Sequence, residues 1–342
     1  MIDFVIPWVD GSDPEWLKQK AKFDSSVKTY NNSDMRYRDW GLLRYVLRGI
    51  ETNCPWYNKI YLITEGHIPS WLDLSSGKIQ LITHKDLYFN KNHLPIFSSP
   101  SIEMNLAKLT QLSDKFVYMN DDFLILKPVL QERFFQNNLP VDFFCHGWLS
   151  RNKLFEKLRG MNSWAHSIKN NIDLINREFS SNKLSSEHLY SKSYSFLNKI
   201  SNFLYANLYK KVLWIEHYHQ PAPYLKNTLS QVRTIFSREM DVCSANRFRE
   251  NTDLNQYLYR YYQLINGIFY PYKYKDHKYY KIQTKEDIQK CLNEIDKFTF
   301  VCPNDSVPDD IAEDDYHFIT SSLICKLEKL LPKPSQFELK NK

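Results

Sequence analysis

A pair of adjacent carboxylates, Asp121 and Asp122, directly follows the apolar run at residues 115–119. Such a run is typical of a buried strand, and ligands of parallel sheets bind at the carboxyl ends of the strands. Paired carboxylates in this place suit Mg²⁺ or Mn²⁺, because hard cations prefer oxygen ligands. The alternative is a solvated turn that binds nothing, and the pattern alone leaves both interpretations open.

Two further carboxylates, Asp10 and Asp13, lie with Gly11 and Pro14 after the apolar run at residues 2–9. These residue types are common in turns because of their backbone preferences and their local hydrogen bonds. Their position at the end of a second predicted strand also suits binding of a ligand or metal. The residues themselves do not decide between the two interpretations.

His219 is the candidate general base, because the ordinary pKa of a histidine lies near neutrality. A lone histidine is more often a hydrogen-bonded part of a core. A third interpretation involves His217, since residues i and i+2 of a strand share a face and two such histidines could ligate a metal.

Arginine is the residue type best suited to binding a phosphate group, because its planar fork holds phosphate through two hydrogen bonds. Arg249, Arg247, Arg36 and Arg38 are candidates, and solvated arginines at helix ends are the alternative. The chain has only 8 glycines and no glycine-rich phosphate loop. A bound diphosphate would therefore need a metal, basic side chains or a helix N-terminus.

The predicted elements place these residues on an α/β layer with a mostly parallel sheet, because strand-like and helix-like segments alternate through the first 128 residues. The expected strands are at residues 2–9, 59–64, 78–83, 115–119 and 298–302. The expected helices are at residues 39–51, 99–112, 224–240 and 252–268. The predicted organisation is an α/β core at 1–130, a helical insertion or lid at 131–211, a part completing the same site at 212–332, and a loose tail at 333–342.

Composition describes a globular protein of 342 residues with 25% charged residues and a net charge of +6. This mild excess fits anionic partners such as nucleotide sugars or acidic lipids, and it is too scattered to favour nucleic acid. Six widely spaced cysteines without a CxxC pair favour free thiols in a reducing cytoplasm. With no recognisable signal or membrane-spanning stretch, the expected location is cytoplasmic, with peripheral contact at the inner membrane face. The Tyr-rich and Lys-rich stretch at 257–280 could contact a glycan or the membrane interface, or fill the core.

Four blocks of this sequence resemble the Stealth family of sugar-1-phosphate transferases. They are residues 2–14, where Pro7 stands in place of a common Thr; residues 36–123, ending in Asn-Asp-Asp-Phe; residues 219–249, opening with His-Gln-Pro-Ala-Pro-Tyr; and residues 300–305, Phe-Val-Cys-Pro-Asn-Asp. Bacterial members build phosphodiester-linked capsules. An animal relative adds N-acetylglucosamine-1-phosphate to lysosomal glycoproteins.

The resemblance implies a Rossmann-like, GT-A-like nucleotide-sugar-binding core and a specific reaction. A hydroxyl of a glycan or lipid-linked glycan attacks the β-phosphorus of a UDP-hexose, and UMP leaves. The transferred group is expected to be N-acetylglucosamine-1-phosphate. Two alternatives remain: a metal-dependent glycosyltransferase that releases UDP, and a non-catalytic glycan-binding protein.

The resemblance also implies roles for residues of this chain. Catalytic roles fall to His219 as base, Arg249 as phosphate clamp, Asp10 and Asp39. Asp121 and Asp122 are expected to hold the metal. The expected substrate-binding residues are Asp13, Arg36, Arg38, Glu103, Arg247, Asn304 and Asp305. Of these, Glu103 lies on the helix predicted from residue 99, where it could meet the sugar or face water.

Overall fold

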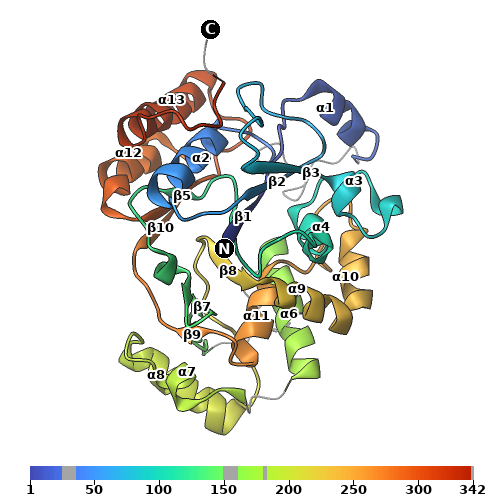
Figure 1. Cartoon of the computed structure of the whole chain (residues 1–342), viewed down its shortest axis with the longest axis vertical. Helices are drawn as coiled ribbons and strands as arrows, with labels where there is room; N and C mark the ends of the chain where they lie inside the picture. Colours follow the sequence, from blue (N-terminus) through green and yellow to red (C-terminus); the bar gives the residue numbers. More distant parts are fainter. Residues whose placement is uncertain (25–35, 149–160, 180–182, 340–342) are drawn as a thin grey trace.

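A five-stranded sheet organises the chain, and the computed structural model describes residues 1–24, 36–148, 161–179 and 183–339 (Figure 1). The strand order is β3-β2-β1-β4-β8. The strands are β1 (Ile2–Pro7), β2 (Ile60–Thr64), β3 (Ile79–Thr83), β4 (Lys115–Tyr118) and β8 (Ala222–Leu225). The first four run parallel, and β8 pairs antiparallel with β4. The prediction of a mostly parallel α/β sheet is confirmed, while a specifically GT-A-like core stays a prediction.

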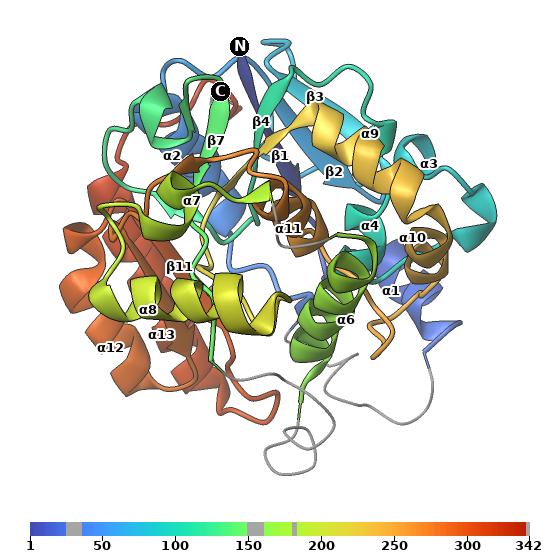
Figure 2. The same ribbon diagram turned by 90° about the horizontal axis from the view of Figure 1, so that it is seen from below.

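The sheet is buried on both faces, which explains why its strands are continuous apolar runs. Along β1, Phe4 and Ile6 belong to one core cluster, and Val5 between them belongs to the other. The first cluster is formed with α2 (Leu42–Asn53), α12 (Lys285–Glu294) and α13 (Glu313–Leu330). The second is formed with α6 (Ser163–Glu178), α9 (Lys226–Ile235), α10 (Ser237–Ser244) and α11 (Tyr257–Ile265). The molecule is therefore a three-layer α/β/α arrangement, seen from two directions in Figures 1 and 2.

Two smaller sheets adjoin this core, with strand orders β10-β11-β5 and β6-β7-β9. Their strands are β5 (Leu124–Ile125), β6 (Phe135–Gln136), β7 (Leu139–Asp142), β9 (Tyr270–Pro271), β10 (His277–Ile282) and β11 (Phe300–Asp305). The remaining helices are α1 (Pro14–Ala21), α3 (His84–Leu87), α4 (Ser99–Glu103), α7 (Ser186–Tyr190) and α8 (Phe196–Leu204). Short 3₁₀ turns lie at Lys91–His93, Leu106–Lys108, Gln131–Arg133 and Ile295–Lys297, and the π-helical turn η6 lies at Tyr205–Tyr209.

The long helix predicted from residue 99 is wrong, because α4 ends at Glu103. Asn105 uses its side chain to bond the carbonyl of Ser101 and the hydroxyl of Ser244, at 2.9 Å each. Such side-chain hydrogen bonds compete with the helical backbone pattern. The predicted apolar residues further along are nonetheless buried, on a 3₁₀ turn and a loop.

The helix predicted at 224–240 is also partly wrong. Its first residues belong to β8, and the rest divides into α9 and α10 at Phe236. The segment predicted as a helical insertion begins with β6 and β7, and α6 belongs to the second core cluster. The described part of that segment is therefore built partly into the common core, and a lid role stays a prediction.

The predicted loose tail is wrong for residues 333–339. Phe337 is fully buried in the first core cluster. Both carboxylate oxygens of Glu338 accept from Arg48 on α2, at 2.7 and 2.8 Å. Its polar composition suggested a solvated tail, but an apolar anchor followed by an ion pair fixes this segment to α2. Residues 340–342 lie outside the described part of the chain.

Candidate active site

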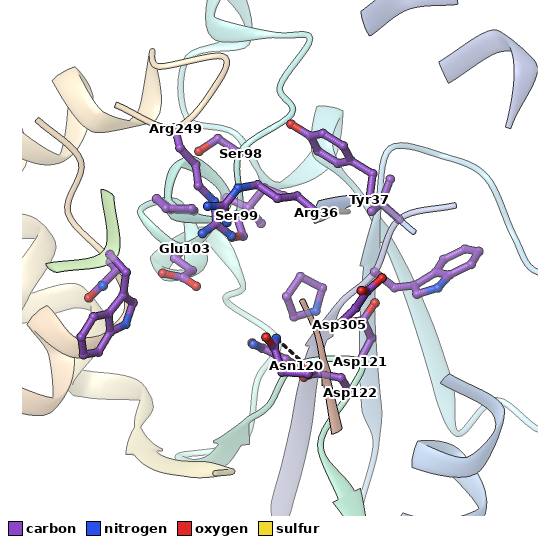
Figure 3. A pocket seen from close by; sticks show the side chains of 18 of the residues that line it. Arg36, Tyr37, Ser98, Ser99, Glu103, Asn120, Asp121, Asp122, Arg249 and Asp305 are labelled. Atoms are coloured by element: carbon purple, nitrogen blue, oxygen red, sulfur yellow. Dashed lines mark hydrogen bonds between the residues drawn. The ribbon is translucent and has the colours of Figure 1, made fainter. Parts of the chain in front are cut away.

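A cavity of about 350 Å³ opens where β1 and β4 end. Parallel strands adjacent in a sheet end at the same edge, so the two polar segments that follow them meet there. The cavity is lined by Trp8 after β1 and by the segment Asn120–Phe123 after β4. Residues from α4, α6, β11 and the segments at 36–40 and 249–257 complete its wall (Figure 3).

The carboxylates of Asp121 and Asp122 lie on one side of this cavity. Burial raises the pKa of Asp121 well above its ordinary value, and the charges of Asp122 and Asp39 add to this effect. Asp122 Oδ1 is buried without a hydrogen-bond partner among the described residues. Asp122 Oδ2 accepts from the thiol of Cys302 at 3.2 Å and the amide of Asn304 at 3.4 Å. Buried carboxylates need a positively charged or hydrogen-bonding partner, and one oxygen of this pair has none in the described part of the chain. This arrangement is expected of a site that binds a cation.

The residues at this point fit a divalent ion. Asp122, His219 and Cys302 offer ligand atoms within 4.8 Å of one another. The Cys302 thiol already donates to Asp122, so the groups open to a cation are carboxylate oxygens and an imidazole. Oxygen ligands favour a hard ion such as Mg²⁺. A metal role for Asp121 and Asp122 stays a prediction, and His219 lies beside Asp122.

Asp39 stands at the same edge and is oriented by two hydrogen bonds. Its Oδ2 accepts from the indole of Trp8 at 3.2 Å, and its Oδ1 accepts from the backbone of Gly41 at 2.7 Å. Gly41 has a φ of 73°, a backbone conformation that glycine adopts without strain. Asp10 lies in an adjoining cavity that shares Asp39, and its carboxylate accepts from the backbone and hydroxyl of Ser12 at 2.9 and 2.6 Å.

Basic side chains lie toward the other side of the cavity. In Figure 3, Arg36 and Arg249 extend toward Ser99 and Glu103, away from Asp121. Arg249 donates to the Ser99 hydroxyl at 3.0 Å. The cavity therefore has a cationic side and an anionic side, and a phosphate between them could contact arginine on one side and a metal on the other.

Glu103 is buried at the cationic side, with 7% of its surface exposed. Its Oε1 accepts from Tyr118 at 2.9 Å, and its Oε2 accepts from the backbone of Gln256 at 2.6 Å. Burial is the largest effect and raises the pKa of this carboxyl to about 7, although both hydrogen bonds and Arg249 oppose it. The alternative that Glu103 simply faces water is therefore wrong.

His219 lies between two aromatic rings and beside Asp122. Its ring meets Phe123 edge to face at 4.7 Å between centroids, and meets Tyr279 in the same way at 5.3 Å. Burial lowers the pKa of the imidazole, while the charge of Asp122 raises it. A lowered pKa keeps the ring neutral near pH 7, as a base must be.

His217 does not share a metal with His219. The segment between Glu216 and Pro221 is not a strand, so the expected common face does not form. His217 instead bonds the hydroxyl of Tyr261 and packs among Trp164, Trp214 and Tyr257.

Arg38 and Asp305 line the cavity but bind each other. Nε and Nη2 of Arg38 donate to the two carboxylate oxygens of Asp305 at 2.8 and 2.9 Å. Arg38 also donates to the carbonyl of Val307 and lies over the ring of Tyr316. This pair joins β11 to the N-terminal half of the chain, and direct contact of Arg38 or Asp305 with substrate stays a prediction.

Two predicted substrate-binding residues lie outside the cavity. Asp13 is the N-cap of α1, where its side chain accepts from the backbone of Trp16 at 2.7 Å. Arg247 lies with its guanidinium over the ring of Phe23 at 4.6 Å. The turn interpretation therefore explains Asp13, and packing on an aromatic ring explains Arg247.

The sequence analysis missed Asp253, Gln256 and Trp164, which also line the cavity. Burial is the main cause that raises the pKa of Asp253 to about 6. Trp164 stands on α6, within the segment predicted as a helical insertion or lid. No motif distinguishes these residues, so only the packing of α6 and of the 249–257 segment could reveal them.

Comparisons with family models and with curated proteins point to the same family. Residues 2–28 match the family model described as Stealth protein CR1, conserved region 1, and residues 36–142 match Stealth protein CR2, conserved region 2. The chain is 35% identical to the capsular polysaccharide phosphotransferase WcwK of Streptococcus pneumoniae, over 99% of this chain and 98% of that protein. It is 32% identical to the receptor polysaccharide phosphotransferase WefC of Streptococcus gordonii, over 99% of both chains.

A third relative is the exopolysaccharide phosphotransferase cps2G of Lactiplantibacillus plantarum, 32% identical over 98% of this chain and 96% of that one. Among solved structures, the apo-form glycosyltransferase GlyE of Streptococcus pneumoniae TIGR4 matches at 12% identity and a TM-score of 0.23. That match covers 86% of this chain and 72% of the other. A match this remote has no bearing on function.

Proposed function

The chain belongs to the Stealth family, and on that premise we propose that it is a bacterial polysaccharide phosphotransferase. More specifically, it transfers a hexose-1-phosphate from a UDP-hexose to a glycan or lipid-linked glycan hydroxyl, and it releases UMP. N-acetylglucosamine-1-phosphate is the group we propose. The observation that carries the proposal is one cavity with arginines on one side, paired carboxylates on the other, and a histidine beside Asp122.

The reaction forms a bond between the acceptor oxygen and the β-phosphorus of the donor, and it breaks the bond between that phosphorus and the oxygen of UMP. Asp121 and Asp122 would hold Mg²⁺ or Mn²⁺, which would offset charge on the transferring phosphoryl group. Arg249 and Arg36 bind the phosphate oxygens from the opposite side. Their fixed positions orient the phosphorus toward the acceptor.

His219 accepts the proton of the attacking hydroxyl. Its ring is held edge-on between Phe123 and Tyr279, so a neutral nitrogen can be aimed at the acceptor without rearrangement. Asp122 next to it stabilises the imidazolium that forms. Glu103 is held by Tyr118 and Gln256, and we assign it to hydrogen-bonding the donor sugar near Arg249.

The proposed location is the cytoplasm, with peripheral contact at the inner membrane face. Free thiols are expected in a reducing compartment, and all six cysteines are free, five of them buried. Within the described residues, no helix is long and apolar enough to cross a bilayer.

The nucleotide product tests this function. Purified protein is incubated with UDP-N-acetylglucosamine, a glycan acceptor and Mg²⁺, and both products are identified by mass spectrometry. UMP together with a phosphodiester-linked product is expected. UDP with a simple glycoside would instead indicate a glycosyltransferase. Binding of glycan with no nucleotide release from any UDP-hexose would indicate a non-catalytic protein.

A further inference from the structure

Helix α8 and the π-helical turn η6 that continues it lie at one end of the molecule, at the bottom of Figure 1 and across the front of Figure 2. No residue of this segment lines the cavity of the candidate active site. The sequence of α8, FLNKISNFL, is amphipathic at helical spacing. An amphipathic helix on a globular protein normally turns its apolar side to the core.

The face of α8 that contacts the protein is polar. Asn202 is fully buried, and its side chain donates to the carbonyls of Phe144 and Leu189 at 2.7 and 2.8 Å. It also accepts from the backbone of His146 at 2.9 Å, and Ser201 donates to the carbonyl of the same histidine. The two buried residues of α8 itself are therefore held by hydrogen bonds to the protein backbone, while Tyr205 of η6 packs into the second core cluster.

The outward face of the segment is apolar. Phe196 is 77% exposed, Leu197 66%, Phe203 54% and Leu208 66%. Phe196 and Phe203 are seven residues apart, as are Leu197 and the partly exposed Leu204, so the members of each pair lie two turns apart on the same side of the helix. We call Phe196, Leu197, Phe203 and Leu208 the outer apolar face. Exposing four large apolar side chains on one side of a segment is unfavourable in water unless a partner covers them.

Lysines lie in the chain on both sides of this face, while the carboxylate of Glu216 is paired with Lys273 and accepts from Asn198 on the inner side of α8. Residues 190–211 include Lys192, Lys199, Lys210 and Lys211 and no acidic residue. Lys192, Lys210 and Lys211 are solvent-exposed. An apolar helix side flanked by lysines is the combination that lies in the headgroup region of an anionic bilayer.

Because the apolar side of α8 faces outward and lysines flank it, we propose, as a refinement of the peripheral membrane contact proposed above, that the outer apolar face docks the protein on an anionic phospholipid surface. Phe196, Leu197, Phe203 and Leu208 enter the boundary between headgroups and acyl chains, and the lysines contact lipid phosphates. A membrane suits this surface better than a protein does, because one helix side is small beside the roughly 800 Å² per partner of a stable protein interface. The flanking charge supplies the remaining attraction.

The surface differs from the one that the sequence suggested. The Tyr-rich stretch beginning at residue 257 was a candidate for membrane contact, but Tyr257, Tyr259, Tyr261 and Tyr262 are buried on α11. Arg260 in the same helix is also buried, in an ion pair with Asp142. The first part of this stretch therefore fills the core.

Flotation of the full chain with lipid vesicles tests the proposal. The wild type is expected to float with vesicles rich in phosphatidylglycerol and to remain unbound with pure phosphatidylcholine. The change Phe196→Ser with Phe203→Ser should weaken binding at least roughly tenfold, because two large apolar groups no longer leave water. Lys192→Glu with Lys211→Glu should weaken it by a similar factor through charge alone.

Leu130→Ser with Phe318→Ser is the matched control, since these apolar residues are 74% and 38% exposed on other elements. It should bind vesicles like the wild type. All variants should retain nucleotide release with a soluble acceptor, which separates failure of docking from failure of the proposed reaction. Equal vesicle binding by the wild type and the double serine variant would overturn the proposal. The proposal would also be overturned if the wild type bound no vesicles but formed a dimer in light scattering, and the double serine variant did not form that dimer.

Discussion

Replacing Glu103 by glutamine should change how stability depends on pH. In the folded chain the pKa of Glu103 rises from 4.5 to about 7, mainly through burial. The folded state therefore holds this proton more tightly than the unfolded state does. Between pH 4.5 and 7 the unfolded state binds fewer protons, so stability falls as pH rises. Below pH 4.5 the penalty is absent, and above pH 7 it is complete.

The size of the effect follows from the two pKa values. Ionising this buried carboxyl above pH 7 costs about 3 kcal/mol of folding free energy. Glu103→Gln removes that cost. Its amide oxygen still accepts from Tyr118, but its NH₂ group faces the backbone N–H of Gln256, and losing that hydrogen bond costs about 1 kcal/mol. The variant should thus be about 2 kcal/mol more stable than the wild type at pH 8 and about 1 kcal/mol less stable at pH 4.

Urea unfolding followed by fluorescence across this pH range measures the effect. The difference in unfolding free energy between Glu103→Gln and the wild type should change sign at about pH 5, where the ionisation cost equals the lost hydrogen bond. Glu132→Gln, at an exposed residue on another element, is the control, and its difference from the wild type should show no change of sign across this range. A constant difference for Glu103→Gln as well would refute the account, since Glu103 would then have similar pKa values folded and unfolded.

Four further changes test the site. Asp121→Asn should lower turnover at least roughly 10²-fold and weaken Mg²⁺ binding in calorimetry with the fold intact, whereas full activity after metal removal would exclude a metal role. His219→Ala should lower kcat by roughly 10²–10⁴-fold with little change in UDP-sugar affinity, and near-normal turnover would remove it as the base. Arg249→Lys should weaken donor binding as well as turnover, because the ammonium cannot reproduce the planar fork; unchanged affinity would contradict a phosphate clamp. Arg38→Met should cost roughly 2 kcal/mol of stability, and adding Asp305→Asn should recover part of it, since the loss comes from an unpaired, mostly buried carboxylate.

Much of the candidate site could be predicted because its acidic residues follow parallel strands. Strands buried on both faces are continuous apolar runs, and their carboxyl ends share one edge of the sheet. Asp121, which follows β4, is therefore found at that edge, whereas Asp39 precedes α2 and reaches the same edge only through the fold. His219 and Arg249 came from resemblance to a family, since no local pattern distinguishes a base or a clamp from a core histidine or a solvated arginine.

The tertiary structure decided which polar side chains remain available. Arg38 and Arg249 have the same side-chain chemistry, yet Arg38 is bound by Asp305 on β11 and Arg249 faces the cavity. Arg38 and Asp305 are 267 positions apart, and the sequence does not predict pairing over such a separation. Asp13 is likewise a plausible ligand in the sequence and a helix cap in the fold.

Helix α8 shows most clearly what the sequence determines and what only the folded structure decides. Helical spacing in the sequence determines that one side of it is apolar and the other polar, because 3.6 residues per turn fix which side chains align. The spacing does not say which side faces the protein. That choice depends on backbone groups of Phe144, His146 and Leu189, which need hydrogen-bond partners and find them in Ser201 and Asn202. Burying those polar groups turns the phenylalanines outward, so the surface proposed for the membrane exists only in the folded chain.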